Sequence, residues 1–219
     1  MKSKYGFVLM AMLFATMGLA QRSDRLFPSE LWHKGYMVLM SGDTLKAQIK
    51  YDFDNNAALL RHKGTIFSYS TRKILNFEIH DVTSDTYREF FALPYAVRDN
   101  YKVPYLFEVL YEGPLTLLSR EKVAEETTIH NSGYSSYYSQ QPYFTVTEKK
   151  LVFDYYILNM KGDIRPVTMR KKDLLQSMRK HSSEIKRYMK RNKLKLTKQE
   201  DLVRLVAYYN DLEESGARR

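Results

Sequence analysis

Residues 44–51 (TLKAQIKY) alternate apolar and polar side chains without interruption. A period of two is typical of a strand with one buried face and one face in water. Ser41-Gly42-Asp43 forms a turn signal just before this run, and residues 37–40 (MVLM) precede the turn, so the pair is predicted to form a hairpin. The buried face of the second strand would carry Leu45, Ala47, Ile49 and Tyr51.

The same kind of pattern continues to residue 169. Short apolar or alternating runs are separated by glycine turns, which predicts roughly nine strands with mostly antiparallel neighbours. The fold class expected is α+β, with a β-rich body arranged as a sandwich, a twisted sheet or a partly open barrel. The further runs are 59–69, 75–79, 87–93, 105–111, 115–119, 151–160 and 164–169.

From residue 170 the period changes from two to about 3.6. Apolar side chains recur at helical spacing in two groups, first over residues 174–189 and then over residues 202–212. These stripes predict short helices that pack on one another or on the β-rich body. We therefore expect three parts: residues 1–20 as a signal peptide, 21–169 as a β-rich domain and 170–219 as a basic helical segment.

Charge is distributed as unevenly as the periodicity. The chain of 219 residues carries 35 Lys and Arg against 25 Asp and Glu, a net charge of +10. Residues 21–169 hold 18 basic and 18 acidic side chains, whereas residues 170–219 hold 15 basic and 7 acidic ones. The whole excess of positive charge of the predicted mature chain therefore lies on the helical segment.

The cations of the helical segment fall mainly outside its apolar stripes. One interpretation is a solvated face that keeps the protein soluble. The other is a surface that binds an anionic partner, such as lipid head groups, lipopolysaccharide phosphates, an acidic polysaccharide or an acidic envelope protein. Nucleic acid is not an expected partner, because no nucleic-acid motif is present. The candidate binding residues are Arg179, Lys180, Lys186, Arg187, Lys190 and Arg191.

Residues 1–20 have the pattern of a cleavable signal peptide. Lys2 and Lys4 form a positive start, residues 7–17 (FVLMAMLFATM) are mostly apolar and uncharged, and residues 18–20 (GLA) offer small side chains for cleavage. Such an apolar helix spans roughly 17 Å, short of the roughly 30 Å hydrocarbon core, although a buried helix or an uncleaved anchor has a similar pattern. We expect export to the periplasm or the outer-membrane periphery, with no transmembrane segment left after cleavage.

A second candidate for binding is the uncharged stretch 131–143 (NSGYSSYYSQQPY). Tyrosines in a polar loop can stack on a sugar ring or on a partner protein, because the ring supplies area and the hydroxyl a hydrogen bond. A low-complexity hairpin loop is the simpler interpretation. The tyrosines concerned are Tyr134, Tyr137, Tyr138 and Tyr143.

No catalytic residues are predicted. The absence of cysteine excludes disulfides, thiolate metal sites and a cysteine nucleophile, and none of the five histidines has a partner at metal-binding spacing. No sequence motif indicates a cofactor or a metal. Carboxylates such as Glu78, Asp81 and Glu108 could pair across strands for glycoside chemistry. This leaves a periplasmic hydrolase or carbohydrate-processing protein with a cleft in the β-rich body as the alternative function.

Three stretches resemble a broad group of small exported proteins of Bacteroidota type. They are the signal ending at Ala20-Gln21, the G-D-T hairpin within residues 34–53 (KGYMVLMSGDTLKAQIKYDF) and the closing helix of residues 193–212 (KLKLTKQEDLVRLVAYYNDL). The resemblance implies an exported protein of similar layout and transfers no catalytic residues. We expect a binding or structural accessory protein of the cell envelope.

Overall fold

The computed structural model describes residues 26–98, 101–130, 144–168 and 170–217. The predicted signal peptide of residues 1–20 lies outside the described residues and stays a prediction. So do the four loop tyrosines Tyr134, Tyr137, Tyr138 and Tyr143.

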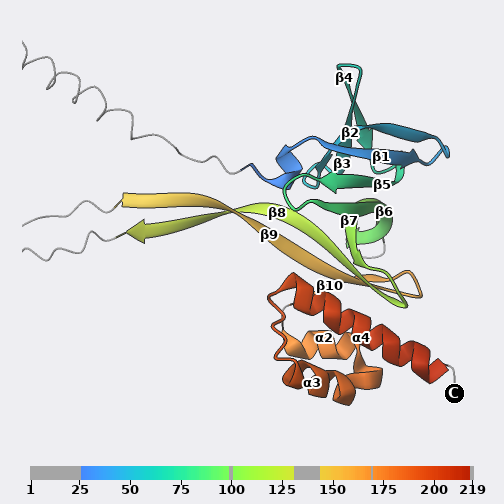
Figure 1. Ribbon diagram of the computed structural model, residues 1–219, viewed down its shortest axis with the longest axis vertical. Helices are drawn as coiled ribbons and strands as arrows, with labels where there is room; N and C mark the ends of the chain where they lie inside the picture. The colour runs from blue at the N-terminus through green and yellow to red at the C-terminus, as the bar shows by residue number, and fades with distance from the viewer. Residues whose placement is uncertain (1–25, 99–100, 131–143, 169, 218–219) are drawn as a thin grey trace, which may run out of the picture.

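The β-rich body is one antiparallel sheet that is open and does not close into a barrel, which confirms the expected α+β class (Figure 1). Its described strands run in the order β10-β9-β8-β7-β6-β5-β1-β2-β3-β4, so β1 lies between β2 and β5 and every other neighbour follows in sequence. The strands are β1 (His33–Leu39), β2 (Thr44–Asp52), β3 (Ala57–His62), β4 (Thr65–Ser70), β5 (Ile74–Asp81), β6 (Thr86–Arg98), β7 (Tyr101–Tyr111), β8 (Leu115–His130), β9 (Phe144–Asn159) and β10 (Ile164–Val167).

The longest pairing, between β8 and β9, extends well beyond the predicted strands. It runs without a break from Leu115 opposite Asn159 to His130 opposite Phe144. Its outer part was not predicted, because charged and threonine side chains there hide the apolar period. Opposite charges face each other across the ribbon, as at Glu125 and Lys149, and such pairs stabilise a strand that is polar on both sides.

The helices follow the sheet and gather at the end away from β1–β5 (Figure 1). They are α2 (Lys171–Ser177), α3 (Ser182–Arg191) and α4 (Gln199–Ala217), with the short 3-10 turns η1 (Pro28–Glu30) near the start of the chain and η2 (Arg179–His181) between α2 and α3. Among the described residues, no helix is both long enough and apolar enough to cross a bilayer.

Two separate apolar clusters stabilise the two ends of the molecule. In the first, the strands from β1 to β7 pack Met37, Ile49, Tyr51, Phe53, Ala58, Leu60, Ile74, Phe77, Ile79, Phe90 and Leu106 together. In the second, the predicted helical stripes close over one face of β8 and β9. Its members are Leu115, Leu117, Tyr155, Ile157, Leu174, Met178, Ile185, Met189, Leu202, Leu205, Val206 and Tyr209.

A buried asparagine attaches the last helix to the sheet. Asn210 of α4 accepts a hydrogen bond from the Leu115 backbone N–H and donates one to the Leu115 carbonyl, both at 2.9 Å. Gly113 lets this amide approach, since a Cβ at that position would lie 2.5 Å from the Asn210 Nδ2. Asn210 therefore positions α4 against the start of β8.

Candidate functional site

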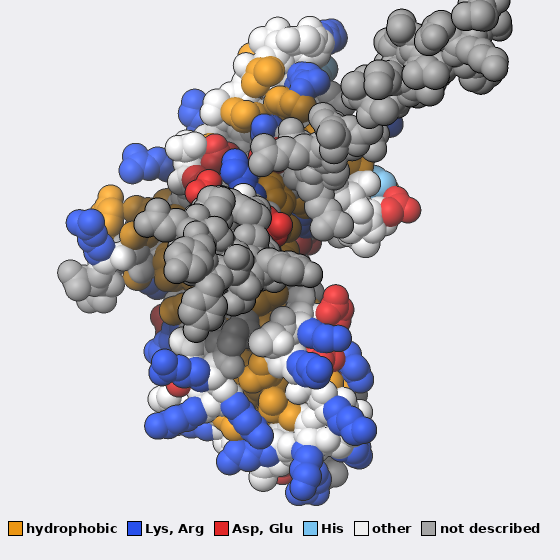
Figure 2. Space-filling view, turned by 90° about the vertical axis from the view of Figure 1, so that its left-hand side faces the viewer, with side chains coloured by type: hydrophobic (Ala, Val, Ile, Leu, Met, Phe, Trp, Pro, Cys, Tyr) orange, Lys and Arg blue, Asp and Glu red, His pale blue; other side chains and the backbone are white. Residues whose placement is uncertain are grey.

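The predicted cations lie together on the outer face of the helical segment. Arg179 and Lys180 are on η2, the other four are on α3, and all six side chains are exposed. Ile185 and Met189 point the opposite face of α3 into the core. In Figure 2, Lys and Arg side chains ring the helical end of the molecule around a strip of apolar side chains.

Most of these cations are available to a partner. Lys180 forms an ion pair with Glu213 of α4 at 2.6 Å. Within the described part of the chain, the other five form no ion pair with a carboxylate. Exposed like charges along one short helix repel one another, so the approach of an anion relieves that repulsion.

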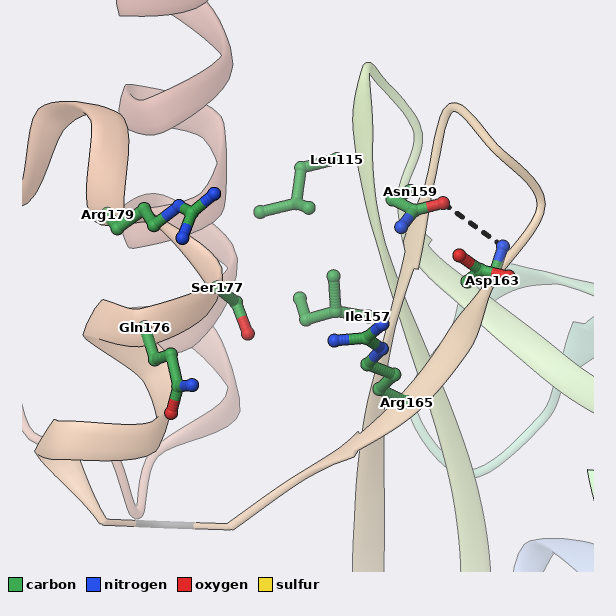
Figure 3. Close-up of a pocket in the computed structure, with 8 residues that line it drawn as sticks. All are labelled: Leu115, Ile157, Asn159, Asp163, Arg165, Gln176, Ser177 and Arg179. Carbon is green, nitrogen blue, oxygen red and sulfur yellow. Dashed lines mark hydrogen bonds between the residues drawn. The ribbon is translucent and has the colours of Figure 1, made fainter. Parts of the chain in front are cut away.

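A cavity of about 290 Å³ opens between the helical segment and the β9–β10 hairpin (Figure 3). Two arginines reach into it from opposite walls: Arg165 from β10 and Arg179 from η2. The sequence pointed to Arg179 alone. Arg165 was missed, because only the fold of the hairpin against η2 brings the two residues together. The lining residues are Leu115, Ile157, Asn159, Asp163, Arg165, Gln176, Ser177 and Arg179.

A second polar site lies on the sheet, where Arg88 of β6 contacts three carboxylates. Its guanidinium donates to Glu108 through Nε and Nη2, both at 2.8 Å, to Glu121 at 3.0 Å and to Asp81 at 2.9 Å. The hydroxyl of Tyr51 accepts from Arg88 at 2.8 Å and donates to Glu121 at 2.6 Å. We call these five residues the Arg88 network.

Burial and pairing act in opposite directions on the groups of the Arg88 network. Burial opposes ionisation of Asp81, but hydrogen bonds from Thr83 and Arg88 overcome it and hold the pKa of Asp81 below its usual value. Burial raises the pKa of the Tyr51 phenol far above its usual value, so Tyr51 remains a neutral donor. The pKa of Arg88 also rises, since its carboxylate partners outweigh the effect of burial.

The structure tests which of the suggested carboxylates come together. Asp81 and Glu108 both meet at Arg88, beside a hollow of about 520 Å³. Glu78 does not, because it is an odd number of residues from Asp81 on β5 and points to the other face of the sheet. There it lies opposite Glu89 of β6. Arg88 and Glu121 were missed, since nothing in their local sequence distinguishes them from surface charges.

The described histidines are not arranged as metal ligands. Buried His33 accepts a hydrogen bond from the Val82 N–H at Nδ1, so Nε2 carries the hydrogen and donates to the Pro28 carbonyl at 2.7 Å. His80 and His181 each face one carboxylate, Asp85 and Glu213 respectively. Among the described residues, no three His, Asp or Glu side chains are grouped so that they could hold a metal ion.

Comparison of the chain with protein-family models, with curated proteins and with solved structures finds no match.

Proposed function

We propose that the protein is an exported binding or structural accessory of the cell envelope, whose basic helical segment contacts an anionic partner. The observation that carries this proposal is the exposed row of cations on η2 and α3, opposite the buried Ile185 and Met189. The helices are anchored on the sheet through a shared core, so the cations form a fixed patch. The signal-like residues 1–20 and the resemblance to exported proteins support the location.

The α3 cations are the part of this patch that suits a flat anionic surface. Lys186, Arg187, Lys190 and Arg191 occupy two successive turns, so they point to one broad side of the helix. A cation held close to an anionic membrane contributes about 1 kcal/mol, which for four residues sets an upper limit of about a thousandfold in affinity. The attraction falls with salt because the Debye length shrinks.

Sedimentation with phosphatidylglycerol vesicles tests the proposal. We expect binding at about 50 mM salt that is lost near 0.5 M. The variant K186E/R187E/K190E/R191E should lose binding at least about tenfold. A matched variant, K46E/R72E/K73E/K102E, changes the net charge equally at exposed sites of the β-rich body and should bind like the wild type. Equal losses in the two variants would show that net charge alone acts, and would contradict the proposed surface.

The alternative, a hydrolase or carbohydrate-processing protein, is favoured by the hollow beside Asp81 and Glu108. Glycoside hydrolysis needs one carboxyl group that holds a proton for the leaving group. Both carboxylates are turned toward Arg88 and accept hydrogen bonds from its guanidinium, so neither is directed at a leaving group in the hollow. Release of reducing sugar from envelope polysaccharides by the wild type, abolished in Glu108→Gln, would reverse this preference.

A further inference from the structure

We propose that the cavity between η2 and the β9–β10 hairpin binds a phosphate ester that carries a hydrogen-bond donor, such as an amino-alkyl phosphate. The proposal adds a small-molecule site to the helical segment. It rests on the proposed function only in treating this segment as the anion-facing part of the molecule. The main observation in support is that Arg165 and Arg179 reach into one cavity from two different elements (Figure 3).

The two arginines have the chemistry that a phosphate requires. Neither forms an ion pair with any carboxylate among the residues described. A guanidinium presents its N–H groups as a planar fork, which matches two oxygens of a phosphate. Forks from opposite walls can share the three terminal oxygens of a phosphate monoester, whereas one fork already satisfies a carboxylate.

Neutral donors lie beside Arg179 on the helical wall. Among the described residues, the Ser177 hydroxyl is engaged only by a 3.5 Å contact to the Asp173 carbonyl, so a phosphate oxygen can redirect it at little cost. Gln176 is exposed and lines the same wall. The floor is formed by Leu115 and Ile157, which offer no competing acceptor from their side chains.

Asp163 determines the orientation of the ligand. It is the only carboxylate that lines this cavity in the described part of the chain, and it lies on the β9–β10 turn, away from Ser177 and Arg179 (Figure 3). It repels a phosphate from that end and can accept a hydrogen bond from an ammonium or hydroxyl group. With two arginines and one aspartate, the cavity lining carries a net charge of +1. An amino-alkyl phosphate, whose net charge is about −1, neutralises it. The volume of about 290 Å³ suits such a small molecule.

Calorimetric titration of the purified protein with O-phosphoethanolamine tests the site. We expect the wild type to bind and R165Q/R179Q to lose affinity at least about tenfold, because both charged hydrogen-bond donors are removed. The control K195Q/K198Q removes the same charge at exposed positions of the α3–α4 connection and should stay within about twofold of the wild type. The absence of wild-type binding at millimolar concentration, or equal losses in the two variants, would overturn the proposal.

Two further arms identify the orientation and the source of the ligand. Asp163→Asn should reduce the preference for O-phosphoethanolamine over inorganic phosphate, and an unchanged ratio would refute the placement of the ammonium group. Phosphatidylethanolamine vesicles separate the sources, because this head group is a phosphodiester with two terminal oxygens and no net charge. We expect vesicle binding to be the same in the wild type and in R165Q/R179Q, which assigns the site to the soluble monoester; a loss in the variant would assign it to a lipid head group and overturn the monoester. The α3 charge reversal does not alter any residue of this cavity, so the proposed function and this site can fail independently.

Discussion

Replacing Arg88 with methionine removes the common partner of three buried carboxylates. Asp81, Glu108 and Glu121 have side chains that are 2%, 7% and 1% exposed, so water from the adjacent hollow reaches little of their surface and replaces the guanidinium only in part. Removing one member of a buried ion pair costs about 3 to 5 kcal/mol, because it leaves an uncompensated charge. We expect Arg88→Met to lose at least that much free energy of unfolding, a large share of the roughly 5 to 15 kcal/mol typical of a domain.

Urea denaturation followed by circular dichroism measures the loss, and its pH dependence tests the cause. In the wild type, the pKa of Asp81 is lower in the folded protein than in the unfolded chain. Its contribution to the free energy of unfolding is therefore complete above the unfolded pKa and is lost as the pH falls through the folded pKa. Without Arg88, three neighbouring carboxylates lie buried with no cation between them, and protonation removes their mutual repulsion, so Arg88→Met should become relatively more stable as the pH falls. The two proteins should therefore respond to acid in opposite directions.

Two comparison variants make the result decisive. Arg204→Met removes an exposed arginine whose pair with Asp201 is 3.5 Å long, and it should change stability by less than about 0.5 kcal/mol. Adding D81N/E108Q/E121Q to Arg88→Met removes the stranded charges and should recover part of the loss. The reasoning would be refuted if Arg88→Met unfolded within about 1 kcal/mol of the wild type, or if its stability fell with acid as the wild type's does.

Two more substitutions test other parts of the structure. Asn210→Ala removes both hydrogen bonds to Leu115 and should lower the free energy of unfolding by about 2 kcal/mol. Amide hydrogen exchange should rise first in α4, and an equal rise in all elements would show that α4 is held mainly by its apolar face. Burial and the neighbouring Glu78 and Glu112 raise the pKa of Glu89, so its ionised form destabilises the fold above that pKa. Glu89→Gln should therefore stabilise the protein by a few tenths of a kcal/mol at pH 7. Thermal melts at pH 7 and pH 4 should show the gain only at pH 7.

The Arg88 network connects the two apolar clusters. Along one face of β8, Leu117 of the helix-covered cluster is followed by Ser119 and Glu121 of the polar region. Tyr51 belongs to the other cluster and reaches Glu121 through its hydroxyl. An open sheet with a core at each end needs a join between them, and here hydrogen-bonded charges supply it. We expect the network to stabilise the relative position of the two ends more than it serves chemistry.

Local periodicity was enough to predict much of the fold. Strands such as residues 44–51 carry a period of two because one face is buried, and the helices after residue 170 carry a period near 3.6 for the same reason. The basic patch was also readable, since exposed charges need no particular partner and fall outside the apolar stripes.

Tertiary structure alone decided which distant residues meet. In the sequence, Arg88 and Arg165 look like ordinary charged residues of strands. The register of the sheet places Arg88 among three carboxylates, and the docking of η2 places Arg165 opposite Arg179. The order of strands, with β1 between β2 and β5, was likewise undetermined. The reason is physical: an amphipathic period reports which face is buried, whereas pairing depends on contacts between segments far apart in the chain, which leave no local signal.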